Sequence, residues 1–196
     1  MRRNEFEVND PEAIERFLAE CDYGVLSIIS DGAPYGVAVN FAFGDGMFYF
    51  HGALEGKKAQ AISTHANCSF TAVKPYAYIP SYLSDTRSAC PATQFYASVV
   101  ANGAVVRIDE GAQKAFGLNA LMQKMQPEGG YETIDMENPI YTKMLEKTAV
   151  YAIKPETITF KVKTGQNLPK ERKASLIEKL QARGEDETIQ QMKEHL

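Results

Sequence analysis

The chain has 196 residues, 44% of them hydrophobic, so it can bury a core and suits one domain with appendages better than two domains. Its formal net charge of −4 provides no overall basic field for nucleic acid, and no apolar run is long enough to span a bilayer. Three widely spaced cysteines, Cys21, Cys68 and Cys90, favour neither a disulfide framework nor a metal site. The first residues lack the apolar core of a signal peptide, so we expect a cytoplasmic protein.

The first third of the chain is expected to fold into one helix and three strands. The predicted elements are a helix to residue 18 that Asp10 caps and that has Pro11 in its first turn, and strands over 23–30, 34–43 and 47–51. Asp31-Gly32 and Gly44-Asp45-Gly46 are typical of tight hairpin turns. Strands joined by such turns predict an antiparallel meander.

The rest of the chain alternates between strands and helices. The expected elements are a helix over 57–64, a strand over 66–74, a long loop over 75–91, a strand over 94–107 that bends at Asn102-Gly103, a helix over 109–126 capped by Asp109, a helix over 139–146, strands over 149–153 and 157–162, and a helical tail from residue 169. About six short strands with rim helices predict a mainly β fold, a small antiparallel barrel whose closure removes sheet edges. The tail is too polar for a core of its own, so it either covers the barrel or embraces a partner subunit.

The end of the third strand carries the pattern of an anion site. His51 is followed by the small residues Gly52, Ala53 and Gly56, and Lys57 and Lys58 then occupy the first turn of a helix. Free N–H groups and lysines at a helix start favour a phosphate. A nucleotide-triphosphate loop is excluded, because its glycine spacing and its Ser or Thr after the lysine are missing. An ordinary surface turn with solvated lysines explains the same residues equally well.

Three segments, Asp31–Val39, Phe48–Ala53 and Gly56–Lys58, resemble successive motifs of the FMN-binding split barrels. The nitroimidazole-resistance proteins are the most similar members, and the pyridoxamine 5′-phosphate oxidases are more distant. The resemblance covers roughly residues 10 to 160 and implies an antiparallel split β-barrel with peripheral helices, over residues 1–163, and a C-terminal helical extension over 164–196. It also implies a homodimer with two flavins in clefts between the subunits.

The resemblance assigns roles to particular residues. It places Lys57 and Lys58 at the FMN phosphate and His51 and Gly52 beside the cofactor. The positions implied to line the flavin ring or hydrogen-bond to it are Val37, Ala38, Val39, Asn40 and Ser98. His51 would also move protons near the substrate, although a histidine that only ends a strand is the simpler interpretation without the resemblance. No metal is expected, because His65 and Cys68 lack further ligands.

The resulting hypothesis is an FMN-dependent oxidoreductase that reduces a small, nitroaromatic-like substrate by two electrons. NAD(P)H or another reductase would supply the electrons. The alternative is a non-catalytic flavin sensor, for which Gln166-Asn167 and the helical tail are the motivating features; a haem or a deazaflavin in the same cleft is a third hypothesis. The aromatic loop around Tyr76, Tyr78, Tyr82 and Arg87 either lines a pocket or packs on the partner. A pyridoxamine phosphate oxidase proper is less favoured, because the last strands lack basic residues for a substrate phosphate.

Overall fold

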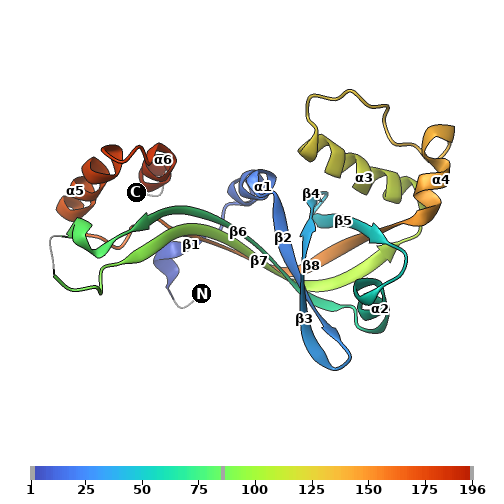
Figure 1. Cartoon of the computed structure of the whole chain (residues 1–196), viewed down its shortest axis with the longest axis horizontal. Helices are drawn as coiled ribbons and strands as arrows, with labels where there is room; N and C mark the ends of the chain where they lie inside the picture. Colours follow the sequence, from blue (N-terminus) through green and yellow to red (C-terminus); the bar gives the residue numbers. More distant parts are fainter. Residues whose placement is uncertain (1–2, 85–86, 195–196) are drawn as a thin grey trace. The chain divides into compact units, whose positions relative to one another are not determined.

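The computed structural model describes residues 3–84 and 87–194, which form an antiparallel sheet flanked by helices (Figure 1). The strands are β1 (Glu7–Val8), β2 (Tyr23–Ser30), β3 (Ala33–Asn40), β4 (Ala42–Gly44), β5 (Met47–Ala53), β6 (Asn67–Ile79), β7 (Thr93–Ile108) and β8 (Thr148–Lys163). The helices are η1 (Asn4–Phe6), α1 (Pro11–Glu20), α2 (Lys57–Thr64), η2 (Ser81–Ser84), α3 (Gly111–Met125), α4 (Pro139–Lys147), α5 (Lys170–Gln181) and α6 (Asp186–Glu194). Within these residues, no helix combines the length and the apolar character that a membrane crossing requires.

The chain divides into two compact units. We call the residues Pro11–Ala72 and Val100–Ile158 the main unit, and the residues Met1–Asp10, Val73–Val99 and Thr159–Leu196 the tail unit. Strands β6, β7 and β8 contribute residues to both. The division predicted after residue 163 stays a prediction.

Both predicted hairpin turns are present in the main unit. Asp31 and Gly32 adopt positive φ angles of 54° and 75°, and Asp45 and Gly46 adopt 50° and 72°. Two successive positive φ angles match the right-handed twist of the flanking strands, which is why Asp-Gly is favoured there. The turns therefore join β2 to β3 and β4 to β5 as predicted.

The predicted meander is wrong after β3. The chain leaves the ladder at Phe41, which is fully buried, with its ring centroid 4.9 Å from that of Phe70. Burying this ring ends the pairing with β2, and β5 pairs with β8 instead of β3. The order is β3-β2-β6-β7-β8-β5-β4, with β1 beside β8, so strand pairing among the described residues leaves β3 and β4 at two ends and does not close a ring.

Strand β8 is one continuous strand, where two were predicted. Pro155 does not interrupt it, because Gly103 on β7 leaves room for a close backbone approach. A Cβ atom on Gly103 would lie 2.1 Å from the carbonyl oxygen of Lys154 and 2.9 Å from the Cα atom of Pro155. Gly103 therefore serves a close contact between strands.

Two further local predictions need correction. Glu110, not Asp109, caps α3, because its carboxylate accepts hydrogen bonds from the N–H groups of Ala112 and Gln113, while Asp109 pairs with Arg107 at 2.8 Å. The predicted loop over 75–91 begins later, since β6 continues to Ile79 and η2 follows. Residues 85 and 86 of that loop lie outside the described residues.

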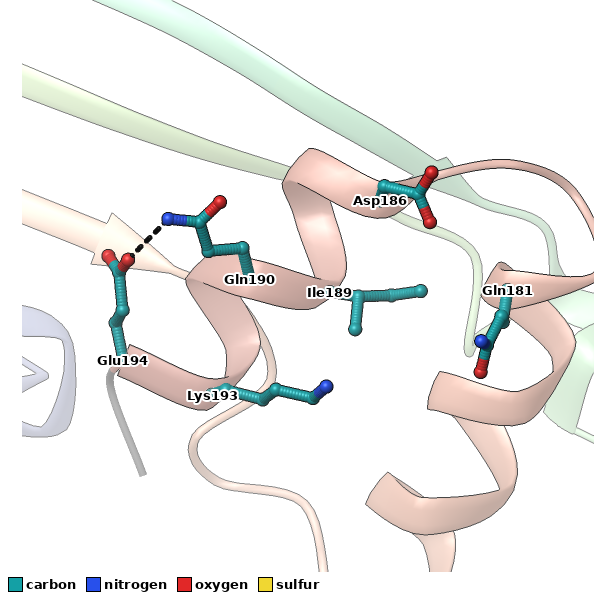
Figure 2. Close-up of a pocket in the computed structure, with 6 residues that line it drawn as sticks. All are labelled: Gln181, Asp186, Ile189, Gln190, Lys193 and Glu194. Atoms are coloured by element: carbon teal, nitrogen blue, oxygen red, sulfur yellow. Dashed lines mark hydrogen bonds between the residues drawn. The ribbon is translucent and has the colours of Figure 1, made fainter.

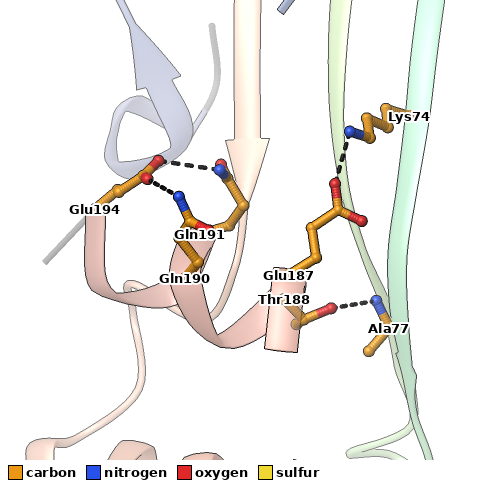
Figure 3. Close-up of polar contacts among 7 residues, drawn as sticks. All are labelled: Lys74, Ala77, Glu187, Thr188, Gln190, Gln191 and Glu194. Carbon is orange, nitrogen blue, oxygen red and sulfur yellow. Dashed lines mark hydrogen bonds and ion pairs between the residues drawn. The ribbon is translucent and has the colours of Figure 1, made fainter. Parts of the chain in front are cut away.

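In the tail unit, the two C-terminal helices cover the ends of β6 and β7. Their shared core contains Ala77, Ile79, Phe95, Leu176, Leu180, Ile189 and Met192. Figure 3 shows that Thr188 of α6 accepts a hydrogen bond from the N–H of Ala77 at 2.9 Å, while Glu187 pairs with Lys74 at 2.6 Å. The tail therefore packs on the sheet, which was one of the two predicted arrangements.

Candidate functional site

The corner between β5 and α2 belongs to the main unit and is open. Gly56 precedes α2 with a φ angle of 111° and provides no side-chain cap, and a Cβ atom there would meet open space. The first N–H groups of a helix have no partners within the helix. The start of α2 therefore presents donors that an anion can accept from. We call the residues His51–Lys58 the β5–α2 corner.

Lys58 lies inside this corner. Its Nζ atom is 3.3 Å from the carbonyl oxygen of His51 and lies over the rings of Phe50 and Tyr151, 5.2 Å and 6.0 Å from their centroids. Gly52 makes this position accessible, because a Cβ atom there would lie 2.7 Å from Nζ. Partial burial lowers the pKa of Lys58, since removal from water disfavours the charged form. Lys58 is thus a partly desolvated cation that an anion would stabilise.

Lys57 has a different surrounding. Its side chain is exposed, and its Nζ atom lies 4.6 Å from the ring centroid of Tyr35 on β3. The two lysines that were predicted to share one phosphate therefore rest against different partners. The contact with Tyr35 brings the start of α2 to β3, two residues before Val37.

His51 is exposed on β5, opposite Val150 of β8. Partial desolvation lowers the pKa of its imidazole, and the positive charge of Lys58 lowers it further. The ring is therefore mainly neutral at pH 7. Its backbone carbonyl accepts a hydrogen bond from Lys58 at 3.3 Å.

The predicted flavin-facing segment of β3 lies at the end of the strand order. Val39 is buried, Val37 half-buried, and Ala38 and Asn40 are exposed; the Asn40 amide donates to the carbonyl oxygen of Asp22 at 3.1 Å. One edge of β3 pairs with β2, and its other edge has no strand partner within residues 3–84 and 87–194. Strand pairing within these residues therefore uses only one edge of β3.

Ser98 is the predicted residue that falls outside the main unit. It lies half-buried on β7 in the tail unit, whereas all the other predicted site residues belong to the main unit. The main unit thus brings together Val37 to Asn40, His51, Gly52, Lys57 and Lys58.

Two rings and an arginine near the corner were missed by the sequence analysis. Tyr35 was included only in a motif segment and Tyr151 only in a strand, and neither was given a role, because nothing local distinguishes them from other strand aromatics. A cleft of about 590 Å³ also lies beside α2, between Gly56 and Ala59 on one side and Arg107 and Tyr151 on the other. Neither lysine of the corner lines it.

Other candidate sites offer less chemistry. Figure 2 shows a pocket of about 410 Å³ between the end of α5 and α6, where Gln190 donates to Glu194 at 2.8 Å. Its lining is mostly surface amide and charged side chains, and it contains no predicted site residue. The described part of the chain also has no group of three His, Cys, Asp or Glu side chains placed to hold a metal ion.

The fold is an antiparallel split barrel with helices at its rim, as predicted, but strand pairing among the described residues leaves it open, so the predicted closure is not seen. Solved structures with this fold include flavocytochrome Anf3 from Azotobacter vinelandii, which is 23% identical with a TM-score of 0.72 over 89% of this chain and 77% of that one. A candidate 5-nitroimidazole antibiotic resistance protein from Bacteroides thetaiotaomicron is 20% identical with a TM-score of 0.64 over 80% and 86% of the two chains. The FAD and heme binding protein from Mycobacterium smegmatis is 16% identical with a TM-score of 0.66 over 80% and 72%.

The sequence places the chain in a family. Residues 10–162 match the profile of the pyridoxamine 5′-phosphate oxidases, and the chain belongs to that family. No curated protein sequence matches the chain.

Proposed function

We propose that this protein is an FMN-dependent flavoprotein that reduces a small, nitroaromatic-like substrate by two electrons. Membership of the pyridoxamine 5′-phosphate oxidase family supports it, as does the shared fold with proteins named as a flavocytochrome and as an FAD and heme binding protein. The observation that carries the proposal is the β5–α2 corner, where an uncapped helix start carries two lysines, one of which, Lys57, contacts Tyr35 of β3.

The residues of the corner fit the parts of FMN. The first N–H groups of α2, with Lys57 and Lys58, would hold the phosphate, and the free edge of β3 would offer backbone donors and acceptors to the pyrimidine edge of the ring. Lys58 would exchange its weak bond to the carbonyl of His51 for a charged acceptor. When bound, FMN supplies hydride transfer.

His51 is the proposed proton donor. Reduction of a nitro group consumes protons as well as electrons, and an imidazole next to the corner is suited to supply them. The pKa of this imidazole is lowered, so its protonated form is a minor species at pH 7 and a better acid than an ordinary histidine. NAD(P)H or another reductase would supply the electrons, with the protein located in the cytoplasm.

A second copy of the chain would complete the site. The corner is open on a single chain, and the outward face of the β2–β3 hairpin carries exposed apolar side chains, including Tyr23 at 61%, Val25 at 39% and Ile29 at 38%. Neighbouring exposed apolar residues are typical of an interaction surface. We therefore propose a homodimer with the flavin at the subunit interface.

The flavin sensor is less well supported. Gln166, one of its motivating residues, accepts a hydrogen bond from the N–H of Thr164 and donates to the carbonyl of Val162, at 2.9 Å and 2.7 Å. Its side chain thus holds its own loop. No observation among the described residues favours a sensor over an enzyme.

The test begins with the ligand of the freshly purified protein. An absorbance spectrum and the mass of the released molecule distinguish FMN from FAD, a haem or a deazaflavin. The loaded protein is then supplied with NADPH and a nitroimidazole without oxygen. We expect flavin reduction and its reoxidation by the nitro compound; tight flavin binding without turnover would favour a sensor, and no flavin binding would refute the proposal.

A further inference from the structure

A cavity of about 640 Å³ lies within the tail unit, between the sheet and α5. Its polar lining residues include Arg3, Thr93, Lys163, Asn167, Glu171 and Arg172. Its apolar lining includes Ile79, Leu83, Phe95, Leu168 and Leu176. None of the residues of the β5–α2 corner lines it, so within one chain it is a separate cavity from that corner. We call it the tail cavity.

Three cations face one carboxylate in the tail cavity. Arg3, Lys163 and Arg172 are opposed only by Glu171 among its charged lining residues. The Nζ atom of Lys163 donates to the hydroxyl of Thr93, which is neutral. Desolvation lowers the pKa of Lys163, the Tyr96 hydroxyl partly opposes this, and the charges of Lys161 and Arg3 lower it again. Among the charged residues that line the tail cavity, cations therefore outnumber carboxylates by three to one.

The opposite part of the lining is apolar and well packed. Phe95 and Leu176 belong to the buried core of the tail unit, and Leu168 packs against that core. Gly165 turns the chain here with a φ angle of 84°, and a Cβ atom on it would lie 3.0 Å from both Leu168 and the ring of Phe95. This glycine leaves room for Leu168 and Phe95, which form part of the apolar lining of the cavity.

We propose that the tail cavity binds an amphipathic organic anion, a small molecule with one acidic group and an apolar body. Its volume is in the range of small-molecule sites, about 300–1,000 Å³. The acidic group would meet Arg172, whose planar guanidinium can hold a carboxylate through two hydrogen bonds, with Lys163 and Arg3 nearby. The apolar body would lie against Phe95, Leu168 and Leu176.

The test uses protein saturated with FMN, so that the flavin site does not bind the probe. Fluorescence titrations compare anilinonaphthalene sulfonate with its neutral analogue phenylnaphthylamine, and decanoate is added as a competitor. We expect the anionic probe to bind and decanoate to displace it. Arg172→Gln should weaken the sulfonate about tenfold, the loss of one charge-assisted contact, and leave the neutral probe unchanged. Lys170→Gln, which removes a lysine of α5 that does not line the cavity, should leave both unchanged.

Cys90 reports the location of binding. It is exposed and lines the tail cavity, whereas Cys21 and Cys68 are buried. Decanoate should slow the reaction of Cys90 with N-ethylmaleimide in the wild type and not in Arg172→Gln, as measured by mass spectrometry of the modified peptide. Two results would overturn the proposal. One is an equal affinity of the wild type and Arg172→Gln for anilinonaphthalene sulfonate, and the other is labelling of wild-type Cys90 that decanoate does not slow. Flavin loading is measured in the same samples, so failure of the flavin proposal would be seen separately.

Discussion

The two lysines of the β5–α2 corner should distinguish FMN from riboflavin. The two ligands differ only by the phosphate, so a lysine that binds the phosphate affects the affinity for FMN alone. Lys57→Met and Lys58→Met remove one ammonium group each and keep most of the aliphatic side chain. Lys143→Met, on the exposed surface of α4, provides a matched control.

The expected magnitudes follow from the surroundings of each lysine. Lys57 is exposed, so its contact with a phosphate is worth about 1 kcal/mol, or roughly fivefold in Kd. Lys58 is partly desolvated and over two aromatic rings, so its contact is worth about 2 kcal/mol, or roughly thirtyfold, after release from the carbonyl of His51. The double variant should lose on the order of a hundredfold for FMN.

The assay is titration of the apoprotein by quenching of flavin fluorescence, with both ligands and at low and moderate salt. Riboflavin affinity should change by less than about twofold in every variant, because riboflavin has no anionic group for the lysines. A parallel loss for both ligands would mean that the lysines act on the fold or on the ring. An unchanged Kd for FMN in the double variant would refute the phosphate assignment.

Three further predictions test the fold and the site. Gly103→Ala should destabilise the protein by about 3 kcal/mol in urea unfolding, because its Cβ atom would meet the backbone of Lys154 at 2.1 Å. The control Gly36→Ala places its Cβ atom 3.5 Å from a valine methyl and should destabilise the protein by less than about 1 kcal/mol. Equal stabilities of the two variants would contradict the close approach of the strands. Burial lowers the pKa of Lys124 to about 8 from 10.5, so the folded state releases this proton first and the free energy of unfolding should rise between pH 8 and 10.5. The rise should be about 1–2 kcal/mol, because the side chain is only half-buried and solvent screens part of the shift. Lys124→Met should remove that rise, and an unchanged pH profile would contradict it. His51→Gln should leave FMN affinity within about twofold, slow nitro reduction roughly a hundredfold, and abolish the increase in rate as the pH falls below 6.5. Loss of flavin binding instead would make His51 a cofactor-binding residue and contradict its role as proton donor.

The parts of the fold that depend on residues close together in the sequence could be predicted from it. Asp31-Gly32 and Asp45-Gly46 form their turns because two positive φ angles are a local requirement, and the alternation of β2 follows from the burial of one face. The partner of β5 could not be found this way. It pairs with β8, about a hundred residues later, because the burial of Phe41 separates β3 from β4.

The candidate site shows the same limit. The small residues and lysines after His51 predicted a helix start without a side-chain cap, and this feature depends only on residues adjacent in the sequence. The separation of Lys57 and Lys58 depends on Tyr35 from β3 and Tyr151 from β8, which reach the corner only through the sheet. Glu110 capped α3 instead of Asp109 because Arg107 holds the aspartate, a competition between adjacent candidates that composition does not resolve.

A crystal structure of the protein with FMN tests the central claim most directly. We predict density for the phosphate at the first turn of α2, within hydrogen-bond distance of its N–H groups and of Lys57 or Lys58, with the ring along the free edge of β3. A phosphate bound elsewhere, or a β5–α2 corner that remains empty when FMN is bound, would contradict the account.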